Sequence, residues 1–244
     1  MRNKIIILTT IIIALILISF WAFSNGMIMT NKLFIKSYAI RGIDVSSYQG
    51  DIDWNVLSTQ GISFVYIKAT EGSSFVDDKF QTNWEEANKT ALKVGAYHYF
   101  SYDSDGGSQA ENFIKTVPQK SDSLPPVIDI ELYGDKLKNI PDKAKTQEQL
   151  SILINELQQY YGKKPIIYAT NKTYNLYIKD KFDDYGIWIR NVLFKPNLSS
   201  NKKWIFWQYT DKAKLEGYNG KEKFIDMNVF YGSYDELVEL TMDC

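Results

Sequence analysis

Two acidic side chains stand two residues apart at the end of an apolar segment. Residues 126–131 read Pro-Val-Ile-Asp-Ile-Glu, with the acids at Asp129 and Glu131. In a strand, such residues point to the same face, with their bases roughly 6–7 Å apart. This arrangement suits hydrolysis of a glycosidic bond, in which one acid protonates the leaving oxygen and the other stabilises positive charge at the sugar carbon. An ordinary half-exposed strand shows the same alternation, so the pair alone leaves both interpretations open.

Composition limits the classes of function. The chain has 244 residues, 45% of them hydrophobic and 15% aromatic, enough for one large core or two small ones. Residues 1–38 carry four basic side chains and no acid, which leaves 24 basic against 29 acidic side chains in the remainder. An acidic domain is a poor candidate for binding nucleic acid, because that affinity comes from neutralising phosphates. The 17 tyrosines and six tryptophans suit stacking on sugar rings, although most aromatic residues fill cores.

The N-terminus carries an export signal. Residues 5–23 are uncharged and follow Arg2 and Lys4, so they are long enough to cross a bilayer with residues 1–4 in the cytoplasm. Ala22-Phe23-Ser24 is a passable cleavage site, so a cleaved signal peptide is the alternative to a retained anchor, and length favours the anchor. A buried core helix is a weaker third reading. We expect a linker over 24–38 and one extracytoplasmic domain over 39–244, membrane-anchored or secreted.

The chain has one cysteine, Cys244, and one histidine, His98. No intrachain disulfide is possible, and a metal site built from several His or Cys ligands cannot be assembled. A Ser-His-Asp triad would need His98, which lies in the strand-like run Gly-Ala-Tyr-His-Tyr-Phe. We therefore expect neither a metal nor a cofactor, and a histidine that belongs to the core or supports the site.

Strand-like and helix-like segments alternate along the chain. Short apolar runs rich in β-branched and aromatic residues predict eight strands, at 39–45, 64–69, 94–100, 127–131, 165–169, 187–190, 204–208 and 224–229. Helical spacing of apolar residues predicts helices at 53–59, 78–93, 108–117 and 146–161. Alternation of this kind predicts right-handed βαβ units and a parallel sheet, which eight strands can close into a barrel. Because 194–200 and 217–220 read as loops, we predict an irregular TIM-like barrel of the α/β class, (β/α)5(β)3, as a single domain.

Polar side chains gather at the predicted strand ends, where catalytic groups of such barrels lie. They are Asp44, Lys68, Glu71, Asp129, Glu131, Gln208 and Asp226. Lys68 and Glu71 could form a solvated ion pair of little energetic weight, and Asp44 could cap the turn that follows it. Several acids at one mouth raise each other's pKa, and an acid with a raised pKa is what protonation of a leaving group near neutral pH requires.

Seven stretches resemble the family 25 glycoside hydrolases, the N-acetylmuramidase lysozymes. They are RGIDVSSYQGDIDW (41–54), FVYIKATEG (64–72), VGAYHYF (94–100), PPVIDIE (125–131), KPIIYAT (164–170), WIFWQYT (204–210) and FIDMNVF (224–230). The patterns Asp-Val-Ser-x-x-Gln-Gly and Pro-x-x-Asp-x-Glu, in this order, are specific. The resemblance covers residues 41–230, almost the whole expected exported domain.

The resemblance implies hydrolysis of the β-1,4 bond between N-acetylmuramic acid and N-acetylglucosamine in peptidoglycan glycan strands. It implies Glu131 as general acid, with Asp129 assisting the substrate's 2-acetamido group or stabilising the oxocarbenium-like transition state. Asp44 and Asp226 would complete the acidic cluster. The implied substrate-binding residues are Tyr97, Tyr168 and Trp207, which would hold the sugar, and Tyr66, Lys68 and Gln208, which would line the cleft. We expect a monomer.

One departure concerns the segment after the sixth predicted strand. The family usually continues Trp-x-Ala-x-Tyr, whereas this chain has Trp188-Ile189-Arg190-Asn191-Val192. Arg190 would narrow the cleft or offer a cation to a peptide carboxylate.

Mechanism and substrate leave alternatives open. The expected spacing of the two acids falls between the roughly 5–5.5 Å of retaining enzymes and the roughly 6.5–9.5 Å of inverting ones. A retaining route with the substrate's acetamido oxygen as nucleophile is the preferred hypothesis. The alternatives are a non-catalytic wall-binding module, which the intact set of acids disfavours, and a hydrolase of another N-acetylhexosamine polymer such as chitin. A metal-dependent deacetylase is disfavoured by the single histidine.

Overall fold

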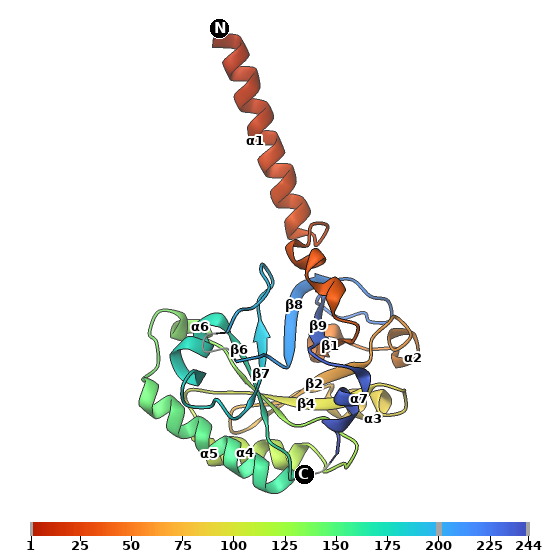
Figure 1. Cartoon of the computed structure of the whole chain (residues 1–244), viewed down its shortest axis with the longest axis vertical. Helices are drawn as coiled ribbons and strands as arrows, with labels where there is room; N and C mark the ends of the chain where they lie inside the picture. Colours follow the sequence, from red (N-terminus) through yellow and green to blue (C-terminus); the bar gives the residue numbers. More distant parts are fainter. Residues whose placement is uncertain (1, 199–201, 243–244) are drawn as a thin grey trace.

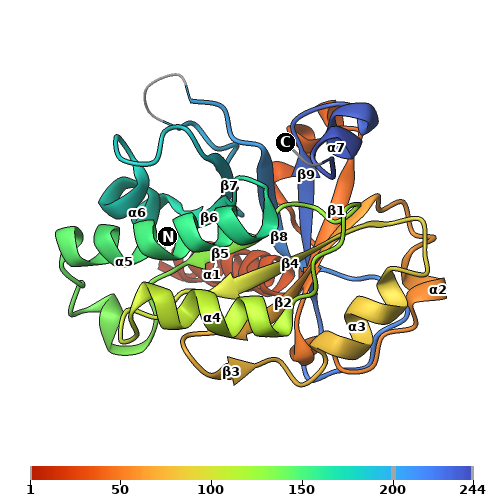
Figure 2. The same ribbon diagram turned by 90° about the horizontal axis from the view of Figure 1, so that it is seen from below.

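Within residues 2–198 and 202–242, which the computed structural model describes, eight strands close into a barrel (Figures 1 and 2). They are β1 (Arg41–Val45), β2 (Phe64–Glu71), β4 (Lys93–Tyr99), β5 (Val127–Ile130), β6 (Ile166–Thr170), β7 (Gly186–Arg190), β8 (Phe206–Ala213) and β9 (Ile225–Phe230). Their order is β1-β9-β8-β7-β6-β5-β4-β2, and the pairing of β1 with β2 completes the ring. The predicted irregular barrel is confirmed. A short strand that was not predicted, β3 (Phe75–Val76), pairs with the end of β2 outside the ring.

One strand runs against the others. The sequence predicted a parallel sheet, but β9 is antiparallel to both of its neighbours, β1 and β8. No helix lies between β8 and β9, so the helical crossover that usually joins parallel strands is missing there. The start of β9 therefore lies at the end of the barrel where the parallel strands finish.

Helices cover the outside of the barrel. The four predicted helices are present as α2 (Trp54–Leu57), α3 (Phe80–Ala87), α4 (Gly106–Thr116) and α5 (Lys143–Tyr161), and β6 is followed by α6 (Asn171–Thr173) and a π-helical turn, η5 (Tyr174–Ile178). Single 3-10 turns lie at η3 (Ser47–Gln49) and η4 (Gly134–Leu137). Asp53, Asp105 and Asp142 cap α2, α4 and α5 by accepting backbone N–H bonds. Figure 2 shows α4 and α5 side by side against the sheet.

Aromatic side chains fill the interior of the barrel. Phe64, Tyr66, Trp188 and Phe206 belong to one buried cluster. Two glycines on the neighbouring strands make room for them: a Cβ at Gly42 would lie 2.4 Å from the Phe64 ring, and one at Gly95 would lie 2.3 Å from the Tyr66 ring. The C-terminal helix α7 (Tyr234–Glu239) adds Leu237 to the same cluster.

The N-terminal helix α1 (Arg2–Ser24) projects away from the barrel and has no buried residue (Figure 1). By length and composition it could cross a membrane. The expected linker after it is not a loose spacer, because its turns η1 (Thr30–Leu33) and η2 (Ile35–Ser37) pack on the barrel. The buried Asn31 side chain donates hydrogen bonds to the carbonyl oxygens of Asn191 (3.1 Å) and Tyr209 (3.0 Å).

Candidate active site

A cleft of about 390 Å³ opens at the end of the barrel where the parallel strands finish and β9 begins. The four acids predicted to be catalytic all line it: Asp44, Asp129, Glu131 and Asp226. The cleft shares Ser46, Tyr48 and Lys68 with a second hollow of about 630 Å³ that extends to the β2–β3 hairpin. The two hollows therefore adjoin, and we call them together the groove.

The four acids reach the cleft from three strands of the ring. Asp129 lies in β5 and Glu131 directly follows that strand, so they share a face as expected. Asp44 lies in β1 and is the register partner of Asp226 in β9. The sequence analysis predicted that Asp226 lies beside the other acids because it treated the last strand as parallel to the rest. It lies there for another reason, because it is near the start of an antiparallel strand.

Two side-chain amides hold the Asp44 side of the cleft. Gln208 Nε2 donates to Asp44 Oδ1 (3.0 Å) and Asp226 Oδ2 (3.2 Å), and Asn228 Nδ2 donates to Asp44 Oδ1 (2.6 Å). Tyr168 Oη donates to Gln208 Oε1 (2.9 Å). Because that amide oxygen already accepts a hydrogen bond, the amide nitrogen must face the acids.

Asn228 is oriented in the same way and was missed by the sequence analysis. Trp188 Nε1 donates to Asn228 Oδ1 (2.8 Å), which turns the Asn228 nitrogen towards Asp44. The available signal was spacing, since Asn228 stands two residues after Asp226 in a strand and therefore faces the same side.

Burial raises the pKa of all four carboxyl groups. For Asp129 the nearby charges of Glu131 and Asp44 add to this effect, whereas for Glu131 the charge of Arg190 opposes it. Asp129 Oδ1 is buried and has no hydrogen-bond partner among the described residues. The cleft therefore contains acids that hold protons at higher pH than usual.

Two cations lie at the rim. Arg190 lines the cleft, and its Nη2 donates to Asp211 Oδ2 at 2.7 Å. Lys68 also lines the cleft, with Nζ 2.7 Å from Glu71 Oε2 and 4.9 Å from the centre of the Tyr99 ring. The ion pair considered for Lys68 and Glu71 is thus present at the edge of the groove, but it is partly buried, with the Lys68 side chain only 15% exposed.

Two of the expected substrate-binding residues lie elsewhere. Trp207 is fully buried on the outer side of the barrel, where it packs on Tyr38 and donates from Nε1 to the Asn191 carbonyl oxygen (2.9 Å). Its assignment to the cleft was wrong because neighbouring strand residues face opposite sides, and Gln208 faces inwards. Trp188 of β7 lines the cleft instead.

Tyr66 is the second correction. It is fully buried in the barrel interior and donates to the Pro125 carbonyl oxygen (3.3 Å), and it does not line the cleft. The remaining expected residues do line it: Lys68, Tyr97, Tyr168 and Gln208.

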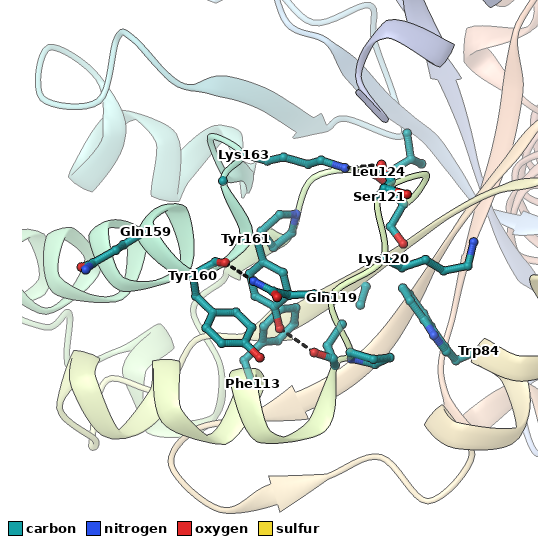
Figure 3. Close-up of a pocket in the computed structure, with 16 residues that line it drawn as sticks. Trp84, Phe113, Gln119, Lys120, Ser121, Leu124, Gln159, Tyr160, Tyr161 and Lys163 are labelled. Carbon is teal, nitrogen blue, oxygen red and sulfur yellow. Dashed lines mark hydrogen bonds between the residues drawn. The ribbon is translucent and has the colours of Figure 1, made fainter. Parts of the chain in front are cut away.

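Another cavity of about 390 Å³, separate from the cleft and its neighbouring hollow, lies among α3, α4, the end of α5 and residues 117–126 (Figure 3). Aromatic residues such as Trp84, Phe113 and Tyr161 line it, with Gln119 and Lys163, but no acid does. It lacks the paired carboxylates that glycosidic hydrolysis needs. Among residues 2–198 and 202–242, no group of three or more His, Cys, Asp or Glu side chains is arranged to hold a metal ion.

Comparisons with known proteins agree with one another. A profile of glycosyl hydrolases family 25 matches residues 43–218. A family 25 glycosyl hydrolase structure from Bacillus anthracis is 55% identical, with a TM-score of 0.81 over 84% of this chain and 95% of that one. The Escherichia coli (strain K12) protein YegX is 34% identical over 82% of this chain and 73% of its own length. Lysozyme M1 of Streptomyces globisporus is 30% identical over 82% of this chain and 71% of its own length.

Proposed function

The chain belongs to family 25 of the glycosyl hydrolases, and on this premise we propose that it hydrolyses the β-1,4 bond between N-acetylmuramic acid and N-acetylglucosamine in peptidoglycan. One observation carries the proposal: Asp129 and Glu131 line one open cleft together with Asp44 and Asp226, and burial raises the pKa of all four acids. The name of Lysozyme M1 supports the choice of substrate.

Glu131 acts as the general acid. Burial raises its pKa, so its carboxyl group keeps a proton at a pH where an exposed glutamate would have lost it. It gives this proton to the glycosidic oxygen as the bond from that oxygen to the sugar carbon breaks. In the second half of the reaction the resulting carboxylate takes a proton from the attacking water.

Asp129 assists the acetamido group of the substrate. Its carboxyl group lines the cleft and accepts a hydrogen bond from the acetamido N–H, which makes the acetamido oxygen a better nucleophile. That oxygen bonds to the sugar carbon as the leaving group departs, and water then opens the ring intermediate with net retention. An inverted anomer at early times, measured by NMR, would contradict this route.

The remaining parts of the proposal concern binding and location. Tyr97 and Tyr168 hold the sugar rings, with Lys68 and Gln208 beside them, and the buried Trp188 packs against Tyr168. The helix α1 anchors the protein in the membrane and leaves the barrel outside the cytoplasm, where a monomer meets the wall.

The test uses the full chain in detergent with purified peptidoglycan, and mass spectrometry of the released muropeptides identifies the cleaved bond. Glu131→Gln is expected to lower turnover by about 10²–10⁴-fold. Glu148→Gln is the matched control, since Glu148 is exposed on α5 and lines neither hollow, and it should retain most of the activity. Equal activity of the two variants would contradict the role of Glu131, and faster release from chitin oligomers than from peptidoglycan would contradict the substrate.

A further inference from the structure

Exposed apolar side chains surround the base of α1 on the barrel side. They come from the segment after the helix and from the loop after β7, and they are Met27, Ile28, Leu33, Phe34, Leu193 and Phe194. We call these six residues the apolar collar. Leu33 is 76% exposed and Phe194 is 67% exposed, values that are high for large apolar side chains on a protein surrounded by water.

The two halves of the collar are fixed to each other. Thr30 Oγ1 donates to the Leu193 carbonyl oxygen at 2.7 Å, and Lys195 Nζ lies 5.8 Å from the centre of the Tyr38 ring. The Asn31 side chain bonds to the backbone at the end of β7 and in β8. These contacts hold the segment after α1 against the barrel, and Figure 1 shows the base of α1 next to it.

The charge around the collar is positive. Segments 24–38 and 191–198 contain three lysines, all exposed, at Lys32, Lys36 and Lys195, and no acidic residue. Asp211, which lines a small cavity beside this region, is paired with Arg190. An apolar surface ringed by lysines fits the boundary between the headgroups and acyl chains of a membrane with anionic lipids.

We propose that the apolar collar inserts into the outer surface of the membrane that α1 spans. This inference rests on the proposed anchoring by α1, with which the collar is continuous. Asp211 lines both the catalytic cleft and the small cavity of about 260 Å³ under residues 23–30. Insertion of the collar therefore holds the β7–β8 rim of the cleft at the membrane surface, so that the enzyme acts on the glycan strands lying next to the membrane.

The experiment measures insertion by contact quenching. The full chain with Cys244→Ser receives one cysteine, either Phe194→Cys in the collar or Asn155→Cys on α5, which lies at the opposite end of the molecule from α1 (Figure 1). Each variant is labelled with an apolar fluorophore and reconstituted in phosphatidylglycerol–phosphatidylcholine vesicles with nitroxide groups high on the acyl chains. Fluorescence at position 194 should fall at least about twofold, and that at position 155 should not change.

A second variant tests the role of charge. Lys195→Glu, with the probe at position 194, should show less quenching than the parent protein in vesicles containing phosphatidylglycerol, and the difference should shrink in pure phosphatidylcholine. If the fluorescence at positions 194 and 155 is equally quenched, in protein that floats with the vesicles, the proposed insertion of the collar is wrong, while anchoring by α1 still holds. Failure to float with the vesicles would overturn both. Hydrolysis of soluble glycan strands by the same samples reports the catalytic proposal separately.

Discussion

Asp44 and Asp226 face each other across the β1–β9 pair, and one nitrogen atom, Gln208 Nε2, lies within hydrogen-bonding distance of both carboxyl groups. Burial, the Asp44 charge and the hydrogen bond to Asp44 raise the pKa of Asp226 well above its ordinary value. Asp226 therefore keeps a proton while Gln208 and Asn228 donate to Asp44. This pair forms the fixed wall of the cleft opposite the proposed acid.

Gln208→Leu should destabilise the protein by about 2 kcal/mol at pH 7, because a carboxylate loses its donor inside the barrel. The loss should be smaller at pH 4, where protonated carboxyl groups need that donor less. Urea unfolding at the two pH values measures the difference, with Gln159→Leu on the exposed face of α5 as the control. An equal loss at both pH values would show that the hydrogen bonds to the acids are not responsible.

Asp129→Asn should stabilise the protein by about 1 kcal/mol at neutral pH while abolishing most activity. Burial raises the pKa of Asp129 in the folded state, so the folded chain binds this proton more tightly than the unfolded chain. The wild type therefore loses stability as pH rises from about 4, the unfolded value, through the folded pKa. Thermal unfolding from pH 4 to 8 should show the gain of the variant growing with pH, and a gain that is constant with pH would contradict the assignment.

Trp188 and Trp207 form a matched pair, since each is buried and each donates a hydrogen bond from its indole nitrogen. Trp188→Phe should lower kcat/KM at least tenfold, because Trp188 lines the cleft and orients Asn228. Trp207→Phe should cost about 1 kcal/mol of stability, the net value of one lost hydrogen bond, because the Asn191 carbonyl oxygen keeps its second donor, Asn31; kcat/KM should stay within about twofold of wild type. Steady-state kinetics with denaturant unfolding of both variants distinguishes the two roles, and the reverse pattern would restore Trp207 to the site.

His98 should make the fold sensitive to acid. Burial lowers the pKa of His98 to about 4, and its neutral ring accepts from Thr70 Oγ1 at Nδ1 (2.7 Å) and donates from Nε2 to Gln109 Oε1 (3.1 Å). Because the unfolded ring binds a proton below about pH 6.5, this residue costs about 3 kcal/mol of stability as pH falls from 6.5 to 4. The stability difference between wild type and His98→Leu should shrink by that amount over this range. A stability difference that is independent of pH would show that the His98 ring has the same pKa in the folded and unfolded chains.

The barrel was largely predictable because its signals are local. Apolar runs marked all eight strands of the ring, and the α5 pattern ended correctly at Gly162, which adopts the left-handed conformation. The direction of β9 was not predictable in this way, because strand direction depends on how the chain returns between β8 and β9. The packing of segment 24–38 on the barrel was missed for the same reason, since a partner such as the Tyr209 carbonyl oxygen is distant in sequence.

The sequence alone predicted four acids at strand ends, with aromatic and amide side chains nearby, and these four acids line one cleft. It did so because strand periodicity and the family motifs are properties of short segments. The tertiary structure decided which tryptophan side chain lines the cleft: Trp188 does, and Trp207 packs on the outer side of the barrel. It also gave the Gln208 and Asn228 side chains their orientation. These outcomes depend on the register and direction of neighbouring strands, and contacts between residues far apart in the chain set both.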